Sequence, residues 1–104
     1  MNERNIRGIV IDAGHGGNDP GATGNGLKEK DLNLEVAKYI YNRLKQLGIP
    51  TTLVRDSDET LSKVERVARI LNAYGNNTDV IVVSNHMNAG GGEYPTTQHN
   101  LIGY

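Results

Sequence analysis

The chain has 104 residues, with 11 lysines and arginines against 12 aspartates and glutamates and a formal net charge of −1 at pH 7. That length fits one domain with a modest core. An apolar content of 37% excludes an intrinsically disordered chain. The chain has no excess of positive charge with which to attract nucleic acid or anionic lipid, so we expect neither a nucleic-acid nor a membrane partner.

Cysteine is absent, which rules out disulfides and requires that any metal be held by histidine, aspartate or glutamate. No stretch approaches the ~20 apolar residues of a membrane span. The first five residues, MNERN, lead straight into an apolar segment without the apolar region of a signal peptide. The expectation is therefore a protein that is made in the cytoplasm and stays there unless something else releases it.

The chain begins with a predicted strand and a long loop. Residues 6–12 contain the β-branched run IVI between Gly8 and Gly14, which predicts a short strand buried on both faces. Residues 13–28 are rich in glycine and are predicted to form a loop. Long loops inside compact domains are usually functional.

Two helices are predicted over residues 30–47 and 61–74, where apolar residues recur every three or four positions. Gly48 and Pro50 end the first, and Gly75 ends the second. The side chains expected to face the core are Leu32, Val36, Ile40, Leu44 and Leu47 in the first helix and Leu61, Val64, Ala68, Leu71 and Tyr74 in the second.

Strands are also predicted at residues 51–54 and 79–84, which are β-branched runs following each helix. The order strand–helix–strand–helix–strand makes two βαβ units with right-handed crossovers. The predicted fold class is therefore α/β, with a parallel-dominated sheet of βαβαβ units and flanking helices.

Two histidines stand where strands of this sheet are expected to end. Ligands of parallel sheets bind beyond the carboxyl ends of the strands, and His15 follows the first strand while His86 follows the third. Glu29 lies at the start of the first helix, within reach of the same crevice. Two histidines and one carboxylate suit Zn²⁺, which leaves a fourth tetrahedral position for water.

Each residue alone has an ordinary explanation. His15 is then a loop residue, Glu29 a carboxylate favoured by the helix dipole, and His86 a half-buried histidine with a satisfied partner. The glycine loop also suggests a phosphate cradle, but residues 14–17 (GHGG) lack the Lys-Ser/Thr of a P-loop. Two histidines at equivalent strand ends together favour the metal.

Three separated segments carry a family resemblance. Residues 9–22 (IVIDAGHGGNDPGA), 26–34 (GLKEKDLNL) and 83–90 (VSNHMNAG) resemble, in the same order, the zinc-dependent N-acetylmuramoyl-L-alanine amidases of the MurNAc-LAA (amidase 3) type. The likeness covers about residues 6–93. Because no signal peptide is evident, phage endolysins are the closest likeness, and a prophage-encoded or mother-cell autolysin would look the same.

The resemblance implies zinc held by His15, Glu29 and His86, and a peptidoglycan substrate cut between the lactyl group of N-acetylmuramic acid and L-alanine. Asp12 is a candidate acceptor for the second N–H of a ligand imidazole, although a structural hydrogen bond to the loop is equally compatible. Arg55 and Arg66 resemble two arginines of the family. They are assigned no catalytic role and are expected to form salt bridges at the surface or the edge of the core.

The sequence departs from the family at its C-terminal end. Family members continue to a second glutamate that is implied to be the general base, whereas residues 94–104 (YPTTQHNLIGY) read as a divergent tail without a family-like strand. Glu93 is a poor substitute, and His99 reads as a loop histidine without a role. The catalytic residues beyond the metal ligands are therefore unknown, and residues 1–93 read as the N-terminal part of an amidase catalytic domain.

Two expectations follow from this departure. Loss of a general base commonly costs 10²–10⁴-fold in rate, so hydrolysis should be weak or absent. Missing strands should leave an unpaired parallel edge. The working hypothesis is a truncated amidase from an interrupted gene. The alternatives are a non-catalytic zinc- or peptidoglycan-binding remnant and, below it, a nucleotide- or phosphate-binding module. No residue pattern indicates an oligomeric state.

Overall fold

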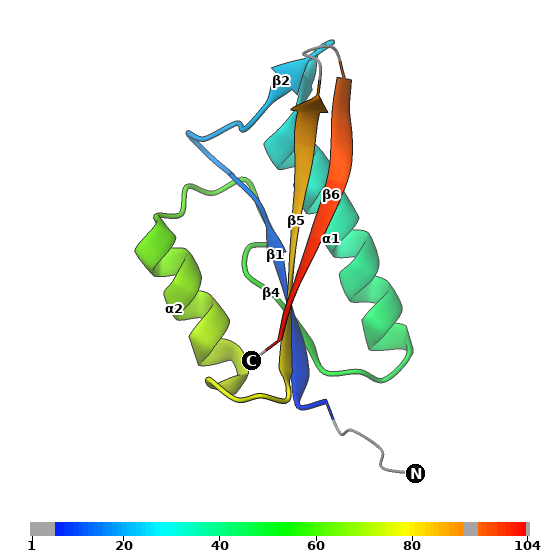
Figure 1. Cartoon of the computed structure of the whole chain (residues 1–104), viewed down its shortest axis with the longest axis vertical. Helices are drawn as coiled ribbons and strands as arrows, with labels where there is room; N and C mark the ends of the chain where they lie inside the picture. Colours follow the sequence, from blue (N-terminus) through cyan, green and yellow to red (C-terminus); the bar gives the residue numbers. More distant parts are fainter. Residues whose placement is uncertain (1–5, 91–93, 104) are drawn as a thin grey trace.

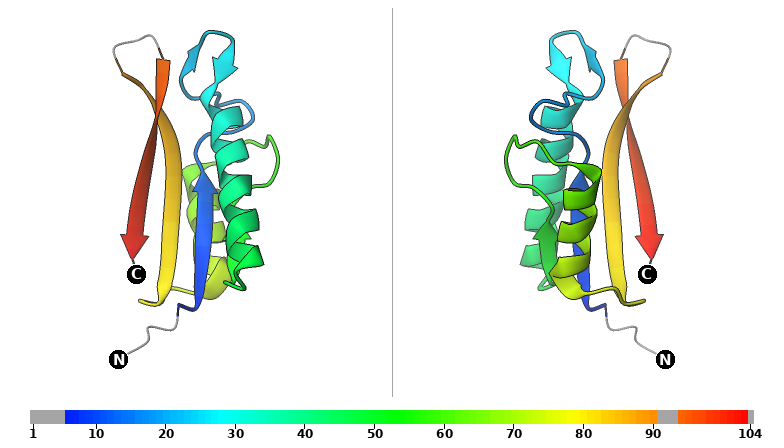
Figure 2. Two further views of the ribbon diagram at one scale, coloured as in Figure 1. Left: turned by 90° about the vertical axis from the view of Figure 1, so that its right-hand side faces the viewer. Right: turned by 90° about the vertical axis from the view of Figure 1, so that its left-hand side faces the viewer.

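The computed structural model describes residues 6–90 and 94–103, with side chains up to Met87. A four-stranded sheet stands between two helices that cover its opposite faces (Figures 1 and 2). The elements are, in order, β1 (Gly8–Ala13), β2 (Thr23–Gly24), β3 (Leu27–Lys28), α1 (Glu29–Gln46), β4 (Thr51–Leu53), α2 (Lys63–Tyr74), β5 (Val80–Gly90) and β6 (Tyr94–Gly103).

The sheet has the strand order β4-β1-β5-β6, and its first three strands are parallel. Central β1 is paired along its whole length with β5, from Gly8 opposite Val80 to Ala13 opposite Asn85. The α/β fold class with a parallel-dominated sheet is confirmed. The glycine-rich segment after β1 is a loop, as predicted, apart from the short β2–β3 hairpin.

The structure corrects the expectations for the C-terminal end. β5 runs on to Gly90, and β6 pairs with it antiparallel from Ile81–Gly103 to Gly90–Tyr94. The segment expected to lack a strand therefore covers the edge of β5, and that parallel edge is not unpaired. β5 is thus longer than the strand predicted at residues 79–84, and its extra residues are paired with β6.

The core forms two layers because successive side chains of β1 point to opposite faces of the sheet. Ile9, Ile11 and Ala13 pack on one face against Ala37 of α1. Val10 packs on the other face with Val54, Val80 and Val82, and the half-buried Leu61, Ile70, Ala73 and Tyr74 complete that layer. No helix in the described part of the chain is long and apolar enough to cross a membrane.

The predicted helix faces are only partly right. In α1, Ile40 and Leu44 pack against the core as expected, but Leu47 is exposed. In α2, the predicted core residues Val64 and Leu71 are exposed, with 80% and 38% of their surface accessible.

Polar contacts made by two arginines account for the exposure of Val64 and Leu71 in α2. Arg66 pairs with Asp12, and Arg69 donates to the carbonyl of Val54 at 2.9 Å. These contacts rotate the helix so that its inner face contains the two arginines and Ile70 rather than Val64.

A candidate metal site beyond the end of β1

Three side chains from different elements meet at one point. His15 follows β1, Glu29 is the first residue of α1, and His86 lies in β5 just past the register of the end of β1. One ligand atom of each lies within 4.8 Å of the other two. The structure thus brings together the three residues that the sequence singled out, although His86 lies inside a strand rather than after one.

The distances within this triad suit a single ion. The Oε2 atom of Glu29 is 3.2 Å from Nε2 of His15 and 3.4 Å from Nδ1 of His86. Tetrahedral coordination with ligands at about 2.1 Å separates two ligand atoms by about 3.4 Å. The two imidazole rings are nearly perpendicular, at 87°, so their nitrogens approach the shared point from different directions. The donor set and its spacing fit zinc.

The carboxylate of Glu29 is buried and held by three N–H donors. Backbone N–H groups of Ala22 and Met87 donate to it at 2.9 Å each, and Nδ2 of Asn33 at 3.1 Å. Burial by itself raises the pKa of Glu29, but these hydrogen bonds outweigh it and bring the pKa below its usual value. The side chain is therefore an anion at neutral pH, as a metal ligand must be.

His15 is oriented by a residue that the sequence analysis missed. Its Nδ1 lies 2.7 Å from Oδ2 of Asp19, which leaves Nε2 facing Glu29. The hydrogen bond to His15 is the main reason why the pKa of Asp19 is lowered. A carboxylate–imidazole pair of this kind fixes the tautomer of a metal-binding histidine. The sequence feature that could have indicated this contact is an acidic residue four positions after the histidine, in a loop whose glycines allow the chain to fold back on itself.

His86 reaches Asp12 only indirectly. Its Nε2 lies 3.1 Å from the hydroxyl of Ser84, and that hydroxyl is 3.4 Å from Oδ2 of Asp12. Asp12 itself forms an ion pair with Arg66. The predicted direct contact between Asp12 and a ligand imidazole is absent from the described residues, and Ser84 takes that place.

Two arginines hold the backbone that carries His15. Arg55 is fully buried and donates to the carbonyl oxygens of Ala13, Gly14 and Lys30 at 2.9–3.1 Å. Arg66 donates to the carbonyls of Ala13 and His15 at 2.8 and 3.0 Å. Arg66 is the expected salt bridge at the core edge, but Arg55 is neither on the surface nor paired with a carboxylate among the described residues.

Gly14 is needed for the site to close. A Cβ atom at this position would overlap the imidazole of His86. His15, the next residue, adopts a left-handed backbone with φ of 64°, which a non-glycine residue keeps only under tertiary constraint. The carbonyl contacts of the two arginines supply that constraint.

Backbone N–H groups of the glycine loop donate hydrogen bonds to side chains of the loop that follows β4. The N–H of Gly17 donates to Asp58 at 2.7 Å and that of Asn18 to the hydroxyl of Thr60 at 2.9 Å. Lys30 joins the same cluster, with its ammonium 2.8 Å from Oδ2 of Asp58. These donors are engaged within the protein, which argues against the phosphate-cradle alternative.

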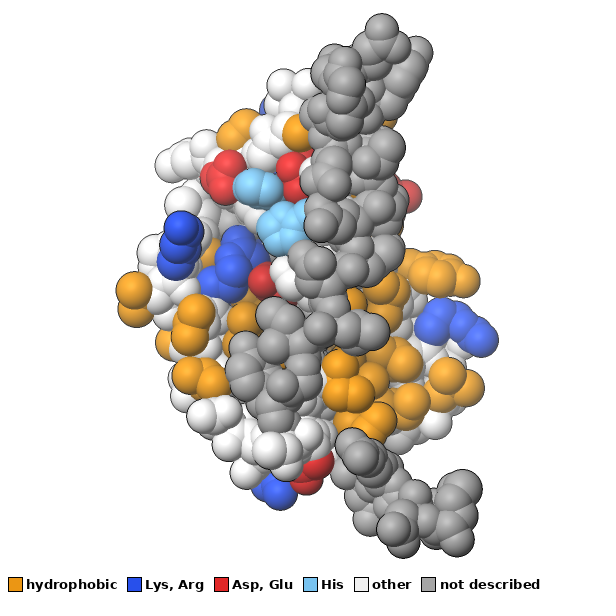
Figure 3. Space-filling model, in the orientation of Figure 1, with side chains coloured by type: hydrophobic (Ala, Val, Ile, Leu, Met, Phe, Trp, Pro, Cys, Tyr) orange, Lys and Arg blue, Asp and Glu red, His pale blue; other side chains and the backbone are white. Residues whose placement is uncertain are grey.

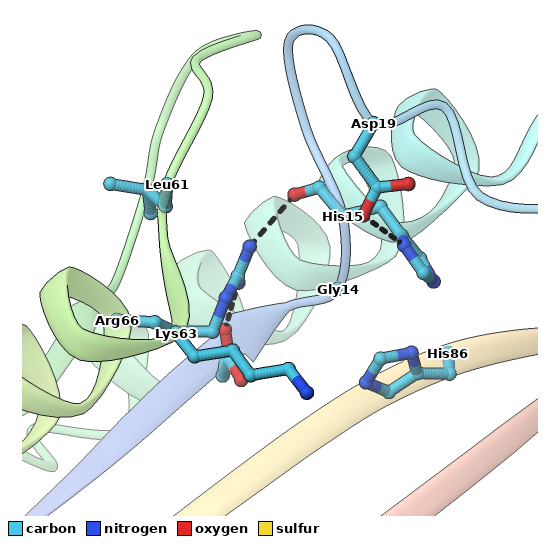
Figure 4. A pocket seen from close by; sticks show the side chains of 8 residues that line it. Gly14, His15, Asp19, Leu61, Lys63, Arg66 and His86 are labelled. Carbon is cyan, nitrogen blue, oxygen red and sulfur yellow. Dashed lines mark hydrogen bonds and ion pairs between the residues drawn. The ribbon is translucent and has the colours of Figure 1, made fainter.

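A pocket of about 240 Å³ opens beside the triad (Figure 4). It is lined by Asp12, Gly14, His15, Asp19, Leu61, Lys63, Arg66 and His86. Histidine side chains lie at the molecular surface here, next to acidic and basic ones (Figure 3). Both carboxylates of the pocket are engaged, Asp12 by Arg66 and Asp19 by His15. Of the other residues considered from the sequence, Glu93 and the side chain of His99 lie outside the described part.

Comparison with known families settles the lineage. The sequence profile described as N-acetylmuramoyl-L-alanine amidase matches residues 9–98. The chain belongs to the N-acetylmuramoyl-L-alanine amidase family. The matched region contains the whole triad and extends into β6.

Individual known proteins are similar over most of this chain. Uncharacterized protein YqiI of Bacillus subtilis is 46% identical over 82 residues, which cover 79% of this chain and 38% of that protein. The sporulation-specific N-acetylmuramoyl-L-alanine amidase of the same organism is 44% identical, over 81% of this chain and 32% of its own length. A crystal structure of an amidase from Clostridium difficile 630 matches with a TM-score of 0.71 and 34% identity, over 81% of this chain and 45% of that one.

Proposed function

We propose that this chain binds one zinc ion through His15, Glu29 and His86 and hydrolyses the amide between N-acetylmuramic acid and L-alanine in peptidoglycan. The observation that carries the proposal is the convergence of the three ligand atoms within 4.8 Å in a member of this amidase family. The chain spans about a third of the length of the curated relatives above, so activity, substrate and site of action at the cell wall are part of the proposal.

The residues around the triad favour metal binding. The carboxylate of Glu29 is ionised, and each imidazole has one nitrogen facing that carboxylate and a polar partner on the other. When bound, zinc would supply Lewis acidity, polarising the carbonyl of the scissile amide and lowering the pKa of a water.

The chain's own residues orient this site. Asp19 holds the imidazole of His15, and Ser84 holds that of His86. Arg55 and Arg66 fix the loop carbonyls on either side of Gly14. Side chains held in this way keep a metal site in one geometry and reduce the reorganisation that binding requires.

The test is release of peptides from purified cell walls. We expect the zinc-loaded chain to liberate peptides with a free N-terminal L-alanine at a low rate, because the described pocket residues offer no free carboxylate as a general base, and a chelator to stop the release. Glu29→Gln should abolish release, while Glu35→Gln on the exposed side of the same helix should leave it unchanged. Release that persists in Glu29→Gln or with the chelator would contradict the proposal.

A second candidate is zinc-dependent binding to peptidoglycan without turnover. It is favoured by the engagement of both carboxylates in the pocket, which leaves no free carboxylate among the described lining residues to act as a general base. Co-sedimentation with cell walls, lost in Glu29→Gln and accompanied by no peptide release, would favour this second function.

A further inference from the structure

We propose that Lys63 makes the site selective for substrates that carry a free carboxylate on the residue that follows L-alanine. The inference rests on the proposed function, because it assigns a substrate feature to the same pocket. Lys63 lines that pocket, and Figure 4 shows its side chain reaching across the opening toward His86.

The backbone at Lys63 is fixed on its N-terminal side. Lys63 is the first residue of α2, and Ser62 before it forms a capping box with Glu65: the N–H of Glu65 donates to the Ser62 hydroxyl at 3.0 Å, and the N–H of Ser62 to the Glu65 carboxylate at 3.1 Å. Leu61 packs against the core layer of α2. The capping box and the packing of Leu61 therefore hold the backbone at the start of α2 in a fixed position.

The first turn of α2 is also attached to the metal-site loop. Arg66, three residues after Lys63, pairs with Asp12 and donates to the carbonyl of His15 at 3.0 Å. Residues three apart in a helix share a face. The attachment of Arg66 thus directs the face that bears Lys63 toward the triad.

Among the residues whose side chains the structure describes, the ammonium of Lys63 has no partner. The acidic groups of the surrounding segments are engaged elsewhere: Asp12 by Arg66, Asp19 by His15, Glu59 by Arg69 and Glu65 in the capping box. Lys63 makes no hydrogen bond or ion pair within the described residues. Among the described residues, the positive charge of Lys63 is therefore uncompensated, and it lies in the same pocket as His15 and His86.

The proposed substrate carries a group of opposite charge one residue beyond the scissile amide. In peptidoglycan the residue after L-alanine is a glutamate linked through its γ-carboxyl, and its α-carboxyl is either free or amidated. A free carboxylate accepts a charge-assisted hydrogen bond from an ammonium, whereas the amide gains little from it. Lys63 would accordingly distinguish the two forms of the stem peptide.

Binding of two synthetic ligands tests this selectivity without requiring turnover. Both are analogues of N-acetylmuramoyl-L-alanyl-D-glutamyl peptides in which the scissile amide is replaced by a non-hydrolysable linkage and the γ-carboxyl is blocked as an amide, and they differ only in a free or amidated α-carboxyl. Calorimetry with the zinc-loaded chain should give a dissociation constant about two- to tenfold lower for the free acid. Lys63→Met should remove this preference, Lys63→Arg should keep it, and Lys63→Glu should reverse it.

Lys38→Met, which removes an exposed lysine of α1 outside the pocket, is the matched control and should keep the preference. Equal affinity of the native chain for both ligands, or a preference that survives in Lys63→Met, would overturn the inference while leaving the proposed function in place. Binding of neither ligand by a chain that has taken up zinc would refute the proposed substrate, and with it this inference.

Discussion

The 2.7 Å contact between His15 and Asp19 decides which nitrogen of that imidazole is available to a metal. With Nδ1 bonded to the carboxylate, Nε2 is the atom that faces Glu29. In His86 the two ring nitrogens exchange these roles: Nε2 is bonded to Ser84 and Nδ1 faces Glu29. The shared point of the triad thus depends on two polar residues that do not themselves belong to it.

Asp19→Ala is therefore expected to weaken zinc binding about 10–100-fold, because His15 loses the partner that fixes its tautomer and orientation. Competition with a chromogenic chelator measures the change. Asp31→Ala, at an exposed position in the first turn of α1, is the matched control and should bind zinc as the native chain does. Equal zinc affinity in Asp19→Ala would show that this contact does not prepare the site.

Strand order and motifs predicted the triad but not the residues that support it. His15, Glu29 and His86 were identifiable because the ends of parallel strands converge and because the motifs resemble one family. Asp19 and Ser84 bond to them through loop folding and strand register, which leave no periodic signal in the sequence. Arg55 was misjudged for a related reason, since charged side chains are rarely fully buried.

At the scale of elements, the contact between the glycine loop and the loop after β4 is electrostatic. Asp58 accepts hydrogen bonds from the ammonium of Lys30 at 2.8 Å and from the N–H of Gly17 at 2.7 Å. The bond from Lys30 is the main reason why the pKa of Asp58 lies below its ordinary value of 3.8. A carboxyl whose pKa is depressed on folding stabilises the fold above its unfolded pKa, and that contribution disappears as the pH falls through the folded pKa.

The thermal midpoint of Asp58→Asn should consequently lie below that of the native chain at pH 6, and the two should converge as the pH falls below 3.8 and through the lowered pKa of Asp58. Asp56→Asn, two residues earlier and also exposed, should match the native chain throughout this pH range. Differential scanning calorimetry across the range provides the comparison. A difference between Asp58→Asn and the native chain that is independent of pH would refute the assignment.

The rotation of α2 is a second feature at this scale. Apolar spacing predicted that Val64 faces the core, but the contacts of Arg66 and Arg69 with the strand ends place Ile70 there instead. Hydrophobic periodicity locates a helix well, but several faces of α2 carry apolar residues, and polar contacts choose between them.

Truncating these two side chains tests the rotation. Val64→Ala should change the free energy of unfolding by less than about 0.5 kcal/mol, as for an exposed position. Ile70→Ala should cost about 1–3 kcal/mol, since its side chain is half-buried against the core. Urea denaturation measures both, and a larger loss in Val64→Ala than in Ile70→Ala would contradict the structure.

At the scale of the whole molecule, the order of elements determines the location of the site. Two βαβ units bring the ends of β1 and β5 side by side, and α1 begins at the same edge (Figure 1). This much was predictable from the alternation of β-branched runs and helical spacing. β6 was not, because antiparallel pairing across a hairpin depends on a partner strand whose end the apolar pattern placed too early, at residue 84.

The zinc content of the purified chain tests the central claim most directly. We predict one equivalent of zinc per chain, lost in His15→Ala and in His86→Ala while circular dichroism shows both variants folded. Asp31→Ala should retain the metal. A folded native chain that takes up no zinc, or a His86→Ala variant that keeps a full equivalent, would contradict the metal site on which the proposed function depends.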